Sequence, residues 1–179
     1  MKKILLVIVF LILFTGCSLS TINDNKPQEA IDTLFEKYRN KDDNVIEQLK
    51  DTIENELSKD EQKKEYEKLM EKQYDNLSYE IKNVKENKDT ATATVDITVL
   101  NYKSAINDAE KELKNNPEKF NDDNNNFSEE KFMDYKIELM KDVKNTVTHT
   151  LTLNLTKSNG MWMVDDLSSD DITKIHGLY

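Results

Sequence analysis

The 179-residue sequence has very few of the residues that build common catalytic and metal-binding motifs: one cysteine, three glycines, two prolines and two histidines. A single cysteine excludes a disulfide within the chain, so no disulfide can add to the stability that the core provides. The few glycines form neither a glycine-rich phosphate loop nor a Gly-x-Ser-x-Gly nucleophile elbow. His149 and His176 lie far apart in the sequence and build no metal triad with their neighbours. We therefore expect no catalytic residue, no metal and no cofactor.

The one long hydrophobic run lies at the N-terminus and ends at the one cysteine. Lys2 and Lys3 form a basic head, Ile4 to Phe14 is uninterrupted apolar sequence, and Thr15-Gly16-Cys17 closes it. A membrane-spanning helix needs about 20 apolar residues, so this run is too short to span and is typical of a secretory signal.

The residues Phe14-Thr15-Gly16-Cys17 resemble the lipobox of bacterial lipoproteins, in which the cysteine is diacylated and becomes the new N-terminus. Phe14 stands where leucine is commonest in that motif, and Leu13 lies one place further back. The resemblance implies a signal peptide over residues 1–16 and membrane attachment through a diacylglyceryl Cys17. Two alternatives stay open: an ordinary cleaved signal with a chance cysteine, and an uncleaved anchor.

The charge balance agrees with attachment by lipid. Cleavage before Cys17 would remove Lys2 and Lys3 but no acid, which takes the net charge from −10 to −12. Such an acidic chain does not bind nucleic acid by general counterion release, and it is not attracted to anionic lipid. We therefore expect no nucleic-acid partner, and a location at the outer face of the cytoplasmic membrane where two acyl chains supply stable anchoring.

Hydrophobic periodicity predicts five helices in the chain beyond the leader. Residues 17–26 are expected to be the lipidated cysteine and a polar tether, and residues 27–179 a single domain. Apolar stripes with helical spacing occur over residues 27–38, 44–57, 58–74, 104–115 and 128–143. Pro27 suits a first helical turn, and Ser58 with Glu61 has the form of a capping box. We expect the stripes to cover a sheet, and partner binding by these stripes is the alternative.

Alternation with a period of two predicts two hairpins. Residues 77–82 and 90–99 form the first, and residues 143–156 and 161–164 form the second, joined by a turn at Asn159-Gly160. Ala91 and Ala93 leave room above the apolar face, which a helix or a ligand must fill. The expected fold class is α+β, with a curved antiparallel sheet of about four strands packed against N-terminal and inserted helices.

The last strand carries a second resemblance. Asn159, Gly160, Trp162, Val164 and Asp165, followed by Ile175-His176-Gly177-Leu178, resemble the closing segment of cystatin-like and nuclear-transport-factor-like lipoproteins of Gram-positive bacteria. The helical pair inserted between the strands, residues 104–142, is also similar to members of that group. The resemblance implies a cystatin-like domain over residues 27–179. It leaves function open, because that fold carries enzymes, ligand binders and dimerisation modules.

Residues 121–126 resemble a calcium loop only in their oxygen-bearing side chains. The sixth position from Asn121 is Asn126 instead of glycine, and the twelfth is Phe132 instead of glutamate. Because an EF-hand needs both the sharp turn and the bidentate acid, we interpret this segment as a solvated loop.

Four residues are candidates for lining a pocket: His149, Tyr79, Tyr102 and Trp162. His149 lies on the apolar face of a predicted strand, where it could act as a general base or simply be a structural core histidine. Trp162 is either an aromatic platform or part of the core. His176 is expected at the surface near the C-terminus.

Two hypotheses of different classes follow from the sequence. The first is a lipid-anchored extracytoplasmic binding or interaction module without evident catalysis, whose partner is a protein, a peptide or a cell-wall component. The alternative is a small-ligand pocket protein, or a weak hydrolase or isomerase, that uses the concave sheet face with His149. Protection against an exported toxin is a third possibility that no residue pattern supports.

Overall fold

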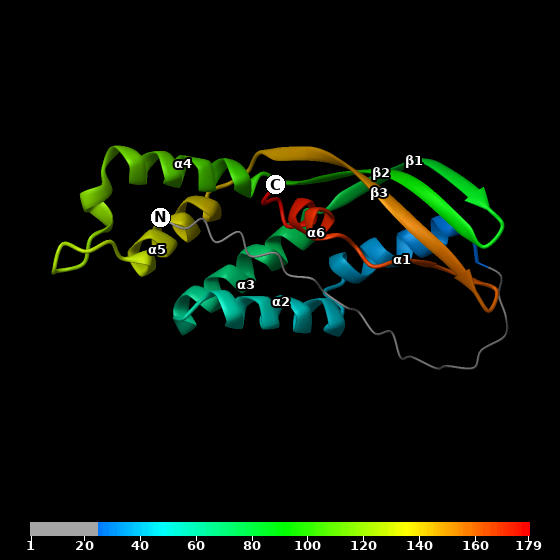
Figure 1. The fold of residues 1–179 in the computed structure, drawn as a ribbon, viewed down its shortest axis with the longest axis horizontal. Coiled ribbons are helices and arrows are strands. Elements are labelled where there is room, and N and C mark those ends of the chain that lie inside the picture. Colours follow the sequence, from blue (N-terminus) through cyan, green and yellow to red (C-terminus); the bar gives the residue numbers. More distant parts are fainter. Residues whose placement is uncertain (1–24) are drawn as a thin grey trace.

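A computed structural model describes residues 25–179, so the expected signal peptide and Cys17 lie outside the described residues. The chain is α+β, as the sequence predicts (Figure 1). Its elements are, in order, α1 (Pro27–Arg39), α2 (Asp43–Glu56), α3 (Asp60–Asp75), β1 (Ser78–Asn87), β2 (Thr90–Leu100), α4 (Tyr102–Asn115), the 3-10 helix η1 (Pro117–Phe120), α5 (Glu129–Lys141), β3 (Thr146–Ser158), β4 (Met161–Val164) and α6 (Ser169–Ile175).

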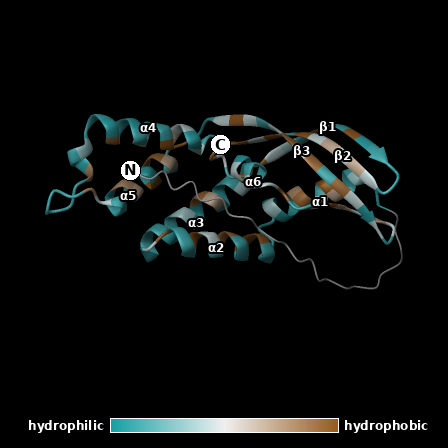
Figure 2. Cartoon of the chain, in the orientation of Figure 1, coloured by the Kyte–Doolittle hydropathy of each residue, from teal (hydrophilic) through white to brown (hydrophobic). Residues whose placement is uncertain are grey.

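The four strands form one open antiparallel sheet in the order β1-β2-β3-β4. β2 pairs with β3 along the whole length of β2, so that Ile97 lies opposite His149 and Thr98 opposite Thr148. Hydrophobic and hydrophilic residues alternate along these strands (Figure 2), because successive side chains point to opposite faces of a sheet. The turn into β4 has the positive φ values expected of an Asn-Gly hairpin, 53° at Asn159 and 84° at Gly160.

The boundaries of the five expected helices lie within two residues of those predicted, but the cap expected at the start of α3 is absent. The Asp42 side chain caps α2, and the Ser128 side chain caps α5. α3 instead begins at Asp60, after Lys59, and Ser58 does not cap it. Leu57 is extended and only 5 % exposed. Burying a leucine stabilises a fold by about 2 kcal/mol, more than the roughly 1 kcal/mol of a cap. The chain therefore turns to bury Leu57, and the capping box does not form.

α1 crosses the apolar face of the sheet and contacts both edge strands, β1 and β4. It fills the room that Ala91 and Ala93 leave, and both alanines are buried in the core. On this helix Phe35 stacks on Tyr79 of β1, with ring centroids 4.4 Å apart. The opposite face of the sheet is rich in threonine and largely exposed, so the sheet has one buried face and one open face.

The remaining helices extend beyond the sheet. α4, η1 and α5 form the insertion between β2 and β3, and α5 packs on α3, which in turn packs on α2 (Figure 1). No helix among residues 25–179 combines the length and the hydropathy that a membrane span requires.

The sheet and the helices meet at Gln73, a fully buried residue of α3. Its Nε2 donates to the Leu100 carbonyl at 3.1 Å, and the Leu100 N–H donates to its Oε1 at 2.8 Å. Gly177 passes directly over this pair, and its carbonyl accepts a hydrogen bond from the Lys103 N–H at 2.8 Å. A Cβ at Gly177 would lie 2.0 Å from the Leu100 oxygen, so glycine is required here.

We expect Gly177→Ala to lower the free energy of unfolding by about 2 to 4 kcal/mol, because it adds a backbone clash to the strain of a φ of +70°. Gly160→Ala is the matched control, since Gly160 has a φ of 84° in the β3–β4 turn. That change should cost about 1 kcal/mol. Urea denaturation of the two variants measures both values, and equal losses would contradict the close packing at Gly177.

Candidate functional site

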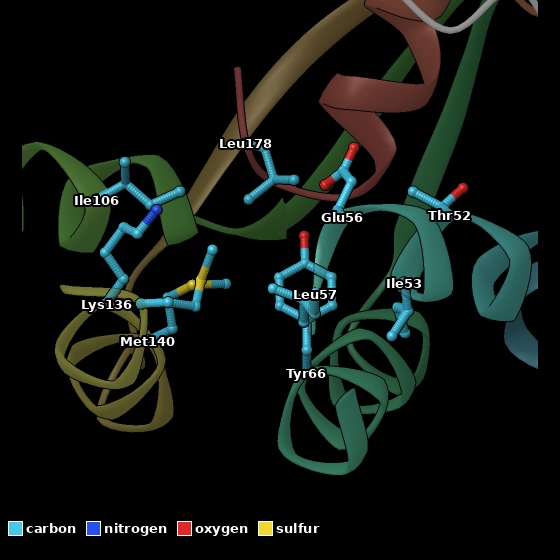
Figure 3. A pocket seen from close by; sticks show the side chains of 10 residues that line it. Thr52, Ile53, Glu56, Leu57, Tyr66, Ile106, Lys136, Met140 and Leu178 are labelled. Carbon is cyan, nitrogen blue, oxygen red and sulfur yellow. The ribbon is translucent and has the colours of Figure 1, made fainter. Parts of the chain in front are cut away.

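A cavity of about 140 Å³ lies where α2, α3, α4, α5 and the C-terminal residues meet (Figure 3). It is lined by Thr52, Ile53, Glu56, Leu57, Tyr66, Ile106, Met133, Lys136, Met140 and Leu178. Six of these side chains are apolar and four carry polar groups. The Thr52 hydroxyl donates to the Gln48 carbonyl at 3.0 Å, which leaves Glu56, Tyr66 and Lys136 to contact a ligand. A small concave site with a few polar groups in apolar walls is the usual form of a ligand pocket.

The apolar walls come from the helical stripes that the sequence shows. Ile53 faces the cavity from the last turn of α2, and Leu57, the extended residue that follows the helix, lies beside it in the wall. Met133 and Met140 of α5 also line the cavity, and Leu178 lines it from the C-terminal segment. Methionine side chains are flexible and polarisable, which suits a wall that adapts to ligand shape.

The Tyr66 hydroxyl points from α3 into the space between Glu56 and Lys136 (Figure 3). No hydrogen bond joins it to another group of residues 25–179. Among these residues the buried side-chain polar atom without a partner is His149 Nε2, so the Tyr66 hydroxyl is open to solvent within the cavity. Burial and, to a smaller extent, the nearby Glu56 carboxylate raise the pKa of Tyr66, so the hydroxyl keeps its proton. It is therefore free to donate a hydrogen bond to a ligand.

Glu56 and Lys136 carry opposite charges on opposite sides of the cavity. Burial raises the pKa of Glu56, while the Lys136 charge lowers it. Burial lowers the pKa of Lys136, and Glu110, Glu56 and Glu129 raise it. The two side chains attract each other, but within the described part of the chain no ion pair within 4.0 Å joins them. Each charge is partly desolvated and can gain a closer partner from a bound molecule.

The four pocket residues that the sequence suggests do not line this cavity, and the structure places them at separate positions. Tyr79 donates to Asp32 of α1 at 2.7 Å, and burial raises its pKa to about 12, with a further contribution from that hydrogen bond. Tyr102 is fully buried and donates to the Leu69 carbonyl at 2.9 Å. Both tyrosines have structural hydrogen bonds.

Trp162 of β4 is only 5 % exposed, and its strand packs against α1. Its backbone N–H donates to the Asn25 side chain at 2.6 Å, and its carbonyl accepts from the same amide at 3.2 Å. Specific contacts with the sheet therefore begin at Asn25, inside the segment expected to be the tether. Trp162 also lines a groove between α1 and β4 together with Leu34 and Lys37. This groove shares no lining residue with the cavity between the helices.

His149 lies on the apolar face of β3, as the alternation predicts. Its ring packs edge-on against Tyr179 at 5.6 Å, and its Nε2 is buried without a hydrogen-bond partner within the described residues. Burial and, secondarily, the Lys174 charge lower its pKa. The C-terminal segment thus covers His149, and no described acid is hydrogen-bonded to the ring to support a role as general base.

The expectation that His176 is a surface residue is wrong. A hydrogen bond of 3.0 Å joins its Nε2 to the Tyr74 hydroxyl. Burial lowers the pKa of His176 to about 4, so the ring is neutral, and its tautomer decides whether Nε2 accepts from the tyrosine hydroxyl or donates to it. The reason is that α6 folds back onto the sheet to bury Ile175, which is 0 % exposed, and carries the next residue with it.

Sequence reasoning missed Glu56, Tyr66 and Lys136 as a group. Tyr66 belongs to an apolar stripe, whereas Glu56 and Lys136 read as ordinary charged positions of two amphipathic helices. No local signal could have shown that the end of α2 faces the middle of α5. Only the packing of α3 between them brings the three side chains together.

No group of three or more histidine, cysteine, aspartate or glutamate side chains suited to a metal ion occurs within residues 25–179. In the loop that resembles a calcium site, Asp122 Oδ1 accepts hydrogen bonds from the Asn124 and Asn126 N–H groups, both at 2.8 Å. These backbone bonds lower the pKa of Asp122. The carboxylate shapes the loop from within.

Comparisons with protein-family models, with curated proteins and with solved structures give no match for this chain. The resemblance to cystatin-like lipoproteins therefore stays a prediction. The fold establishes the α+β class, but three leading helices and two inserted ones do not make it distinctly cystatin-like. The fold and the cavity define an α+β protein with a site of small-molecule size.

We expect Tyr66→Phe to change the free energy of unfolding by less than about 0.5 kcal/mol, because its hydroxyl has no partner to lose. Tyr102→Phe removes the same atom from a buried hydrogen bond to Leu69 and should cost about 1 kcal/mol. Chemical denaturation compares the two. A larger loss for Tyr66→Phe would show that its hydroxyl is engaged within the protein.

The buried His176 predicts a loss of stability in acid. Its folded pKa is about 4, and the usual value in an unfolded chain is about 6.5. Between these values the unfolded chain binds more protons, so stability is full above pH 6.5 and falls as the pH drops towards 4. Allowing for partial exposure of the ring, we expect a loss of about 2 kcal/mol from this residue. His176→Gln should flatten the pH dependence of the urea midpoint by that amount, and identical slopes in the two proteins would refute it.

Proposed function

We propose that this protein is a lipid-anchored extracytoplasmic binding module that holds a small ligand in the cavity between its helices. The observation that carries the binding role is the Tyr66 hydroxyl, which is surrounded by apolar walls and lacks a partner in the described part of the chain. A hydroxyl that opens into the cavity and holds no protein partner can exchange its contact with water for a hydrogen bond to a ligand.

The proposed location depends on the N-terminal sequence. A short apolar run that ends in Thr15-Gly16-Cys17 supports export, cleavage and diacylation at Cys17. The acidic mature chain favours lipid over electrostatic attachment, since it would be repelled from an anionic membrane surface. The cavity would then sample small molecules outside the cytoplasm.

The cavity geometry favours binding over catalysis. A nucleophile or general base has to lie within hydrogen-bond reach of the group that it activates. Glu56, Tyr66 and Lys136 form no hydrogen bonds with one another, and neither histidine lines the cavity. Their separation suits contacts to different ends of one bound molecule.

A protein, peptide or cell-wall partner is the second candidate, and the open face of the sheet favours it. Thr98 and Thr148 share a hydrogen bond of 2.9 Å on this face, and Thr150 donates to Asp96 at 2.7 Å. Met161 and Met163 are about half exposed at 51 % and 48 %. This face offers hydroxyl groups beside an apolar edge, which a polar chain could contact.

We expect Cys17→Ala to abolish incorporation of a labelled palmitate analogue and to move the protein from the membrane fraction to the medium. The reason is that acylation of Cys17 would be the anchor. Ser18→Ala is the matched control and should keep both the label and the membrane location. If Cys17→Ala remained in the membrane fraction like the native protein, an uncleaved anchor would replace the lipoprotein assignment.

A further inference from the structure

We propose that the helical cavity binds a small zwitterion with an apolar body, the chemistry of a free aliphatic amino acid. The inference rests on the proposed binding function and names the ligand class. Glu56 would take the ammonium group, Lys136 and Tyr66 would take the carboxylate, and the apolar walls would hold the side chain.

The size of the cavity sets the size of the apolar body. Its volume is about 140 Å³. An engineered protein cavity of about 150 Å³ binds benzene, a molecule with six carbons. The side chain of a branched aliphatic amino acid is slightly smaller, so it fits between Leu57 and Met140 while the charged end stays near the mouth.

The placement of the charges favours a ligand that carries both signs. Glu56 and Lys136 lie on opposite sides of the space above the Tyr66 hydroxyl (Figure 3). A ligand with only a carboxylate would meet Lys136 but would also face Glu56 without a partner for it. A ligand with only an amine would pair with Glu56 but would leave the Lys136 ammonium without a partner. A zwitterion pairs with both charges. The gain is larger at the half-buried Lys136 than at Glu56, which is exposed to solvent.

The end of α2 supports the ammonium position independently. Glu56 is the last residue of α2, and the last turn of this helix carries no basic residue. α1, α3, α4, α5 and α6 each have a lysine or arginine there. The C-terminal end of a helix carries partial negative charge and is stabilised by a cation. A ligand ammonium beside Glu56 would supply the cation that the sequence omits.

Tyr66 gives the carboxylate a directed hydrogen bond. Its pKa is raised, so the hydroxyl is protonated and donates. A hydrogen bond from an O–H group to a carboxylate is among the stronger ones in proteins. With the ammonium of Lys136 nearby, the two donors define one end of the site and the Glu56 carboxylate defines the other.

The test is methyl NMR of residues 18–179 labelled with ¹³C at methionine. This chain contains the whole described fold, because all core residues lie between Ala30 and Ile175. Met133 and Met140 line the cavity, Met70 reports the core, and Met161 and Met163 are exposed controls on β4. The probes are L-leucine, 4-methylpentanoate, which lacks the amine, and 3-methylbutylamine, which lacks the carboxylate.

We expect L-leucine to shift the Met133 and Met140 methyl signals saturably and to leave Met161 and Met163 unchanged. The two probes with a single charge should bind at least tenfold more weakly. Glu56→Gln and Lys136→Gln should each weaken leucine binding at least tenfold. Glu47→Gln on α2 and Lys131→Gln on α5 are charge-matched controls outside the cavity and should have no effect. An unchanged Met70 signal confirms that each variant is folded.

Each contrary outcome has a distinct meaning. If either single-charge probe bound within tenfold of leucine, the zwitterion inference would be overturned while the pocket function stood. If leucine bound but Glu56→Gln and Lys136→Gln had no effect, the assigned charge contacts would be wrong. If no probe shifted Met133 or Met140, both the ligand class and the proposed function of the cavity would fail.

Discussion

The contact between the sheet and the helices depends on one buried side-chain amide. Gln73 is 0 % exposed and pairs with both backbone groups of Leu100, the last residue of β2. β1 begins only at Ser78, opposite Thr98, so Leu100 extends beyond its neighbouring strand. The Gln73 amide supplies the donor and the acceptor that a longer β1 would have offered to Leu100. Without it, a buried donor and a buried acceptor would each lose a partner, at about 1 to 3 kcal/mol apiece.

The position of the cavity follows from this contact between Gln73 and Leu100. α4 begins at Tyr102, two residues after Leu100, which Gln73 binds, and Leu178 follows Gly177, which lies against that amide. Two walls of the cavity are therefore fixed relative to α3, which itself supplies Tyr66. Because α2 and α5 both pack on α3, they meet around this point without filling it. The polar groups that they carry, Glu56 and Lys136, are left facing a small apolar space.

Local sequence patterns predicted the secondary structure well because the period of burial is a local property. The alternation around His149 placed its face correctly, and Asn159-Gly160 marked the turn. Two errors came from contacts that are distant in sequence. Ser58 lost its capping role to the burial of Leu57, and His176 was drawn inside with Ile175. In both cases a tertiary contact outweighed a local preference.

The sequence by itself determined the α+β class, the buried face of each strand and the expectation of a lipid anchor at Cys17. It could do so because periodicity and the leader motif are read over a few neighbouring residues. Only the tertiary structure decided which charged residues meet. Glu56 and Lys136 lie on helices separated in sequence by a hairpin and three further helical elements, α3, α4 and η1, and packing against α3 brings them to one cavity. A site assembled from distant elements has no local pattern, because its geometry is set by how the helices pack.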